Sequence, residues 1–155
     1  MTEVKPPQAG LGRLRLGGYK DADGDDDVLP WYQRLHVTHV LCLTAEFTPP
    51  KAPGIVVRHL PIADDDPSKD LAGILPKATQ FVGDALNSEG SCVLIHCRNG
   101  ASRAACVTMA VLVTVYAYNL VDAYHFLLHR RRKMDIFGPF LNQLETWCRG
   151  HALGQ

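Results

Sequence analysis

Apolar residues in this chain fall into short continuous runs and into longer stretches with helical spacing. Short apolar, β-branched runs are typical of strands, whereas apolar residues that recur every three or four positions indicate helices. The predicted strands are Arg13–Leu16 at a sheet edge, Thr38–Leu43, Ile55–Leu60 and Cys92–His96. The predicted helices are Val28–Leu35, Leu71–Leu86, Ala104–Tyr118, Val121–Lys133 and Pro139–Arg149.

The alternation of strands with helices predicts an α/β fold, with a central, mostly parallel, twisted sheet flanked by helices. We expect a single domain over residues 13–150, preceded by a flexible tail of residues 1–12 and followed by a short tail of residues 151–155. Pro76 falls inside a predicted helix, so that helix either kinks or restarts there. Ligands of parallel sheets bind at the carboxyl ends of the strands, and the loop after the last predicted strand lies at such an end.

Composition narrows the class of protein. The chain has 155 residues, of which 46% are hydrophobic and 21% charged, as in an ordinary soluble globular domain. Lysine and arginine total 16, as do aspartate and glutamate, so we expect no nucleic-acid or membrane partner. We also expect a monomer. The apolar run 104–118 is shorter than the ~20 residues that cross a bilayer, which favours a buried central helix. Five cysteines and no secretory signal favour the cytoplasm, or also the nucleus.

One short segment carries most of the candidate chemistry. Residues 96–103 read His-Cys-Arg-Asn-Gly-Ala-Ser-Arg, which is the pattern H-C-x-x-G-x-x-R between a predicted strand and a predicted helix. A cysteine at the exit of a strand and an arginine at the start of the next helix form a phosphate cradle with a nucleophile at its floor. A buried strand cysteine beside a helix-capping arginine is the alternative interpretation. The histidine, the central glycine and the strand–loop–helix setting together favour the cradle.

Each residue type in the segment has a physical reason. A helix N-terminus and nearby cations favour the thiolate form of a cysteine, which is the nucleophilic form. Backbone N–H groups of such a loop can converge on phosphate oxygens, Gly100 allows the tight turn, and Arg103 offers a planar fork for two oxygens. The predicted phosphate-binding residues are Arg98, Asn99, Gly100, Ala101, Ser102 and Arg103.

An acidic loop upstream supplies a candidate general acid. Expelling an alkoxide from phosphorus needs a proton donor on the side of the phosphate away from the cysteine. Asp64, Asp65 and Asp66 lie in the segment 61–70, which is rich in aspartate and proline and reads as an exposed loop. For two of the three aspartates, the preferred interpretation is a solvated turn or the capping of the next helix.

The sequence resembles the dual-specificity phosphatases, in particular the small atypical members, of the cysteine-dependent protein tyrosine phosphatase superfamily. The resemblance runs from about residue 13 to residue 150. Beyond the H-C-x-x-G-x-x-R loop, it rests on the opening segment 15–18, the strand segment 38–44, the spacing from Asp65 to Leu71, and the closing segment 138–144.

The resemblance implies a two-step hydrolysis of phosphotyrosine and phosphoserine or phosphothreonine in proteins. Cys97 attacks phosphorus and forms a cysteinyl-phosphate, while Asp65 protonates the leaving oxygen and then serves as base for water. Arg103 and the loop amides bind the equatorial oxygens. His96 organises the loop. No metal and no cofactor is implied.

One position departs from the family. Relatives carry serine or threonine directly after the arginine, where the hydroxyl donates to the cysteine sulfur, and this chain has Ala104. We therefore expect slower breakdown of the intermediate. The alternative is a catalytically weak phosphate-binding pseudophosphatase or interaction module. Ser102 stands just before the arginine and is the residue to suspect if another hydroxyl takes that role.

Further residues suggest substrate and regulation. Arg98 is the only basic residue among the variable loop positions, which favours phosphoprotein over phospholipid. Arg131 has the spacing from Cys97 at which relatives place a second phosphate pocket, although cations at a helix C-terminus are favourable for other reasons. Cys42 and Cys92 lie on predicted strands, from which either could trap Cys97 in a protective disulfide.

Overall fold

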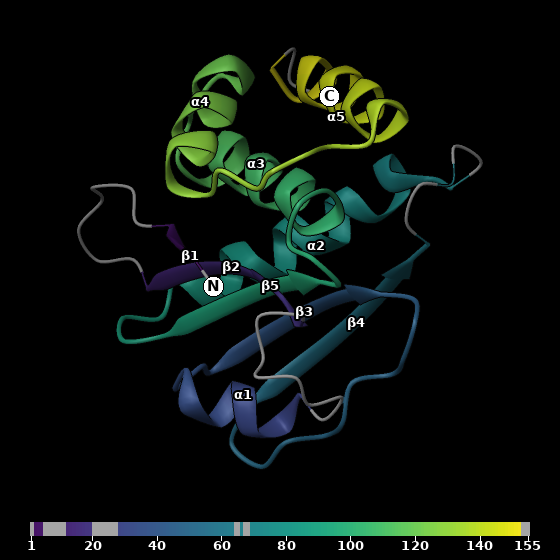
Figure 1. Cartoon of the computed structure of the whole chain (residues 1–155). Coiled ribbons are helices and arrows are strands. Elements are labelled where there is room, and N and C mark those ends of the chain that lie inside the picture. Colours follow the sequence, from purple (N-terminus) through teal and green to yellow (C-terminus); the bar gives the residue numbers. More distant parts are fainter. Residues whose placement is uncertain (1, 5–11, 20–27, 64–65, 67–68, 153–155) are drawn as a thin grey trace.

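A computed structural model describes residues 2–4, 12–19, 28–63, 66 and 69–152. Its centre is a five-stranded sheet in the order β1-β2-β5-β3-β4, with β1 antiparallel to β2 and every other pair parallel (Figure 1). The strands are β1 (Thr2–Val4), β2 (Arg13–Gly18), β3 (His39–Thr44), β4 (Val56–Ile62) and β5 (Cys92–Cys97). The predicted α/β fold with a mostly parallel sheet is confirmed.

The helices cover both faces of this sheet. Helix α1 lies on one face, and the remaining four helices lie on the other (Figure 1). Helices α4 and α5 pack on α3, which itself lies against the sheet. The helices are α1 (Leu29–Arg34), α2 (Leu71–Leu86), α3 (Arg103–Val115), α4 (Leu120–Arg130) and α5 (Gly138–Ala152).

The amino-terminal prediction needs correction. Residues 2–4 of the expected flexible tail form β1, which pairs with β2 in the register Glu3↔Arg15. The predicted edge strand is therefore an inner strand, with β1 outside it and β5 inside it. At the other end of the chain, α5 continues to Ala152, beyond the expected domain boundary.

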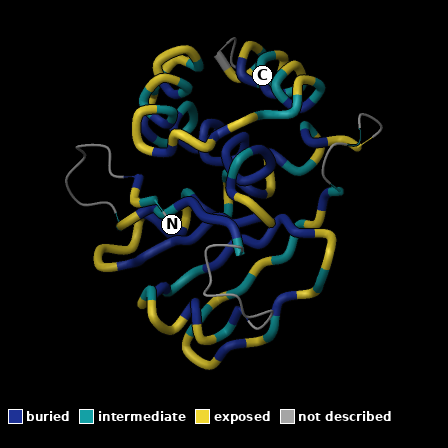
Figure 2. The backbone as a smooth tube through the Cα atoms, viewed as in Figure 1, coloured by how far each residue is buried: buried dark blue, intermediate teal, exposed yellow. Residues whose placement is uncertain are grey.

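Two apolar clusters hold the layers together. The larger one lies between the sheet and α2 and α3, and the smaller one lies under α1. Every residue of β5 is buried, as expected for a central parallel strand covered on both faces (Figure 2). Helix α3 is buried from Arg103 through Leu112, because α4 and α5 cover its outer side. The apolar run that begins at Ala104 is therefore a buried central helix, as predicted.

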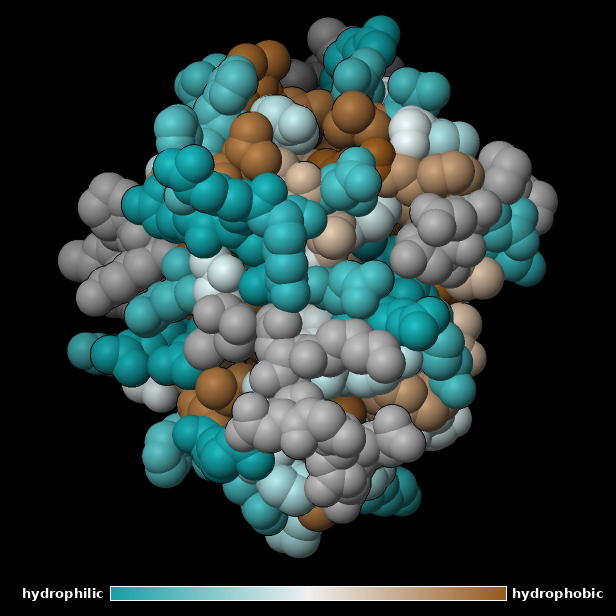
Figure 3. Space-filling model, in the orientation of Figure 1, coloured by the Kyte–Doolittle hydropathy of each residue, from teal (hydrophilic) through white to brown (hydrophobic). Residues whose placement is uncertain are grey.

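On the face shown in Figure 3, brown side chains gather over α4 and α5. The exposed large apolar side chains among the described residues are Val121 in α4 and Val56 in β4. Among the described residues, no helix has both the length and the apolar character needed to cross a bilayer.

Helix α2 runs without interruption through Pro76, so it does not restart there. Its N-terminus is capped by the Asp70 carboxylate, which accepts a hydrogen bond from Gly73 N at 2.9 Å. The side chain of Gln143 in α5 also holds this end, accepting from Ala72 N at 3.1 Å and donating to Lys69 O at 3.0 Å. The end of the acidic loop is thereby tied to the last helix.

Candidate active site

The Cys97 thiol lies at the C-terminal end of β5, where the chain turns into α3. Its sulfur accepts hydrogen bonds from Gly100 N at 3.3 Å and from Ala104 N at 3.4 Å. The residue is only 2% exposed, so the sulfur is at the floor of a loop rather than on its rim. Two backbone N–H groups at the start of a helix therefore converge on this one sulfur.

Two glycines allow the loop to form beside the end of β2. Gly100 has φ of 67°, and a Cβ at this position would lie 2.6 Å from the Gly17 carbonyl carbon. At Gly18, a Cβ would lie 2.3 Å from the Asn99 carbonyl carbon. The backbones of the loop and of β2 are therefore in direct contact, and there is no room for a side chain between them.

Arg103, the first residue of α3, is fully buried and faces the ends of the neighbouring strands. Its Nη1 donates to Ile62 O at 2.9 Å, and its guanidinium forks onto the Glu46 carboxylate at 3.1 and 3.3 Å. A buried guanidinium needs such partners, because an unpaired one would cost several kcal/mol, on the order of 3–5. Glu46 thus fixes the plane of the arginine that the sequence predicts as a phosphate ligand.

Sequence reasoning missed Glu46. It lies in the loop after β3, and its own side chain is 35% exposed. Nothing in its local sequence marks it, since a single glutamate in a proline-rich loop resembles any solvated acid. Only the topology points to it. The loop that contains Glu46 follows the carboxyl end of β3, and the site lies at the carboxyl ends of the parallel strands.

His96 is fully buried behind the loop. Its Nδ1 lies 3.4 Å from Cys97 O, and its Nε2 lies 2.6 Å from the Tyr32 hydroxyl of α1. Burial lowers the pKa of His96 to about 4 and raises the pKa of Tyr32. The ring is therefore neutral at pH 7. The hydrogen bonds fit a tautomer in which Nδ1–H donates to the Cys97 carbonyl and Nε2 accepts from the tyrosine.

Arg131 contacts the back of the loop and differs here from its predicted role. Its Nε donates to Gly100 O at 2.8 Å, its Nη2 to Asn99 O at 2.9 Å, and its Nη1 to Thr2 Oγ1 at 3.0 Å. The residue is 4% exposed. The predicted second phosphate pocket is not formed at this position, because the guanidinium faces loop carbonyls and β1 instead of solvent. Arg131 is a positioning residue for the loop.

The connection between α4 and α5 holds the other side of the loop. Phe137 N donates to the Ser102 hydroxyl at 3.0 Å, and Asp135 N donates to Ala101 O at 2.9 Å. Ser102 is therefore engaged with this connection. Both hydrogen bonds found to the Cys97 sulfur come from backbone N–H groups, and Ala104 adds no hydroxyl.

The remaining predicted site residues divide by exposure. Arg98 and Asn99 are exposed at the loop, Ala101 is half-buried, and Gly100 is buried. Asp64 and Asp65 lie outside the described residues, so the identity of the general acid stays a prediction. Asp66 is described, and its carboxylate lies 4.0 Å from Lys69 Nζ.

The two cysteines proposed to trap Cys97 are placed poorly for it. Cys92 is at the opposite end of β5, five residues away, or about 17 Å along a strand, which is far beyond disulfide reach. Cys42 is opposite His96 in the β3–β5 register and so shares the face of His96 rather than that of Cys97. Burial raises the pKa of the Cys42 thiol to about 11, and all five thiols are free.

The chain is similar to known proteins in sequence and in fold. Residues 19–149 match the family described as "Dual specificity phosphatase, catalytic domain". The chain is 34% identical over 116 residues to dual specificity protein phosphatase 26 of Rattus norvegicus, covering 72% of this chain and 54% of that protein. It is 28% identical over 146 residues to dual specificity phosphatase 28 of Homo sapiens, covering 94% and 80%. The crystal structure of human DUSP28 matches with a TM-score of 0.78 at 25% identity, covering 92% of this chain and 95% of that one. The chain thus spans little more than half the length of the rat relative.

Proposed function

Because the chain belongs to the dual-specificity phosphatase family, we propose that it removes phosphate from phosphotyrosine and from phosphoserine or phosphothreonine in proteins, with Cys97 as nucleophile. The observation that carries the proposal is the position of the Cys97 sulfur. It lies under two converging backbone N–H groups, at the start of a buried helix whose first residue is an arginine held in a fixed plane.

The first chemical step transfers the phosphoryl group to sulfur. The Cys97 thiolate attacks phosphorus, a sulfur–phosphorus bond forms, and the bond from phosphorus to the leaving oxygen breaks. Asp65 gives its proton to that oxygen, which departs as the free hydroxyl of the substrate. Loop N–H groups and the Arg103 fork bind the equatorial oxygens, where charge grows in the transition state.

The second step returns the enzyme to its starting state. The Asp65 carboxylate takes a proton from water, the water oxygen attacks phosphorus, and the sulfur–phosphorus bond breaks to release inorganic phosphate and the thiolate. The departing sulfur meets two backbone N–H groups but no hydroxyl from Ala104. The second step is therefore the slower one.

Positioning supplies much of the catalytic advantage in this scheme. Glu46 and Ile62 O hold Arg103, Arg131 holds the loop carbonyls, and the neutral His96 holds the Cys97 carbonyl. A cradle fixed before substrate arrives loses little conformational entropy when phosphate binds. Its N–H groups remain directed inward, because the carbonyls of Gly100 and Asn99 are already bound on the outside.

Turnover of a small aryl phosphate tests the nucleophile. Cys97→Ser removes the thiolate and should abolish turnover, whereas Cys148→Ser, in a buried position on α5, should leave it within about twofold. Both variants are checked for folding by circular dichroism. Unchanged turnover in Cys97→Ser would overturn the proposal. Phosphotyrosine and phosphothreonine peptides assayed side by side then test the dual specificity.

A further inference from the structure

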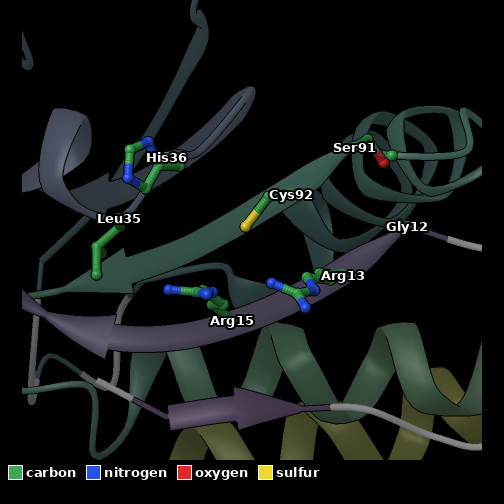
Figure 4. A pocket seen from close by; sticks show the side chains of 8 residues that line it. Gly12, Arg13, Arg15, Leu35, His36, Ser91 and Cys92 are labelled. Carbon is green, nitrogen blue, oxygen red and sulfur yellow. The ribbon is translucent and has the colours of Figure 1, made fainter.

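A second cluster of cationic side chains lies at the opposite end of β5 from Cys97. A cavity of about 530 Å³ opens on the α1 face of the sheet, between β2 and the residues that follow α1. Figure 4 shows the guanidinium groups of Arg13 and Arg15 on one side of β2, near the Cys92 side chain, with Leu35 and His36 across the hollow. The register pairs Arg13 with Cys92 and Gly18 with Cys97, so the strand separates the cavity from the catalytic loop.

The fold explains why these side chains collect here. Leu14 and Leu16 point into the large cluster under α2 and α3, so Arg13 and Arg15 point to the other face by strand alternation. On that face α1 packs against β3 and β5, and β2 is left beside it. His36 has φ of 53°, a left-handed conformation that turns the chain from α1 toward β3 at the edge of the cavity.

The electrostatics of the cavity favour an anion. Two guanidinium groups face one carboxylate, since Glu3 lies opposite Arg15 in the register and 3.6 Å from Arg13 Nε. Burial raises the pKa of the Cys92 thiol, and the charges of Arg15 and Arg13 oppose that rise, which places both charges near the sulfur. Cys92 therefore contributes a neutral, weakly polar wall rather than a second negative charge.

Two polar atoms in the cavity wall, Arg15 Nε and Ser91 Oγ, lack a hydrogen-bond partner among the described residues. Arg15 Nε is enclosed by protein and has no hydrogen-bond partner among the described residues. A buried N–H without an acceptor costs on the order of 1–3 kcal/mol, which a ligand oxygen would recover. Arg103 and Arg131 differ from Arg15 because the Nη groups of both donate to protein oxygens.

We propose that this cavity binds a phosphate group carried on a larger molecule, and specifically a phosphorylated side chain, at a site distinct from the catalytic loop. The planar forks of Arg13 and Arg15 suit a tetrahedral oxyanion. The volume lies in the range of about 300–1,000 Å³ that holds whole ligands, and it exceeds the needs of one ion. A phosphorylated protein would be held here through one phosphate while the catalytic loop stays open.

Nitrogen-15 NMR of the full chain tests the site directly, because the Arg15 Nε–H group gives its own signal. The background is Cys97→Ser, which cannot turn the probes over. The probes are inorganic phosphate, a phosphoserine peptide and the same peptide with serine. The phosphopeptide should shift the Arg15 Nε–H signal and the amides of His36 and Cys92 saturably, apart from any shifts in the catalytic loop. The serine peptide should not.

Matched variants decide the assignment. Arg15→Ala should weaken phosphopeptide binding at this site by about tenfold or more, whereas Arg149→Ala, which removes the same charge from the far surface, should not. Arg15→Lys keeps the positive charge but lacks the planar fork. It replaces the alanine variant in this test if that variant does not fold. Equal saturation by inorganic phosphate would support the site and assign it to the free ion. Binding of the serine peptide with equal affinity, or shifts that persist unchanged in both Arg15 variants, would overturn the proposal.

Turnover supplies an independent check. Arg15→Ala in the otherwise unaltered chain should hydrolyse a small aryl phosphate at the normal rate, because the cavity is remote from the reacting atoms. A loss of that activity in a folded Arg15→Ala protein would contradict a separate binding site. Inactivity of the unaltered chain would count against the phosphatase mechanism only, since NMR detects the cavity without turnover.

Discussion

The two ends of β5 use arginine in opposite ways. At the C-terminal end, Arg103 and Arg131 are buried and bind protein oxygens, a carboxylate in one case and loop carbonyls in the other. At the N-terminal end, Arg13 and Arg15 line an open cavity, and one enclosed donor of Arg15 has no acceptor among the described residues. The difference separates arginines that shape a site from arginines left available to a ligand.

This contrast bears on how the catalytic end works. A loop fixed from behind keeps its N–H groups directed at the phosphate and reorganises little during the reaction. At the N-terminal end, the contact seen for these guanidinium groups within the described residues is the ion pair of Arg13 with Glu3. Substitutions at the C-terminal end should therefore alter chemistry or folding, and those at the other end should alter only binding.

The largest effect is expected at Arg103. Arg103→Lys keeps a positive charge but loses the planar fork, so kcat/KM for an aryl phosphate should fall by about 100-fold or more. Arg149→Lys, the same exchange on an exposed part of α5, is the control and should be neutral. A lysine variant with nearly full activity would show that the fork is dispensable and that charge alone suffices.

The next effect concerns Ala104 and has a kinetic signature. With no hydroxyl to assist the departing sulfur, the unaltered enzyme should release one equivalent of phenol in a burst and then turn over slowly. Ala104→Ser should raise the steady rate by up to about 100-fold and shrink the burst, while kcat/KM stays nearly constant. Rapid mixing measures both phases. The absence of a burst, with a serine variant no faster, would mean that another group assists the sulfur.

Arg131 should affect stability more than substrate binding. Arg131→Met fills a similar volume but removes the bonds to Gly100 O, Asn99 O and Thr2 Oγ1, and should lower the free energy of unfolding by about 3 kcal/mol. Urea denaturation measures the change, with Arg132→Met at the adjacent exposed position as control. If Arg131→Met unfolds like the parent and instead loses affinity only for doubly phosphorylated peptides, Arg131 contacts substrate after all.

The effect with the least consequence at neutral pH is a pH dependence of stability that arises from His96. Its pKa is about 4 when folded and about 6.5 when unfolded, so the unfolded chain binds the extra proton between these values. The stabilisation is complete above pH 6.5 and is lost as pH falls toward 4, by about 3 kcal/mol in all. Urea denaturation at a series of pH values should show this slope in the parent and in His125→Gln, an exposed-histidine control, and a much reduced slope in His96→Gln.

Tyr32→Phe completes that test if His96→Gln does not fold. It removes the hydroxyl that donates to His96 Nε2, which should cost about 1–2 kcal/mol. Because that hydrogen bond favours the neutral ring, its loss should also reduce the slope. An identical slope in His96→Gln would assign the pH dependence to other groups.

Much of this architecture could be predicted from the chain, and the exceptions share a cause. A short apolar run predicts β5, and apolar residues on every side predict the buried helix α3. The position of the loop between them therefore follows from the sequence. β1 has three residues and no periodicity, and it becomes a strand only because β2 offers an edge. Arg131 has the spacing of a ligand, yet its side chain turns inward to the loop carbonyls, which no local pattern reveals. Glu46 and Tyr32 likewise acquire their roles from three-dimensional proximity.

The central claim is a covalent phosphate on Cys97, and the most direct measurement is the mass of the enzyme quenched with acid during turnover of an aryl phosphate. We predict that breakdown of the intermediate is the slow step, so most of the protein should carry one added phosphoryl group, on the peptide that contains Cys97. Cys97→Ser should carry none under the same conditions, and Ala104→Ser should carry much less. An unaltered enzyme that turns over the substrate without any adduct, or with the adduct on another residue, would contradict the mechanism.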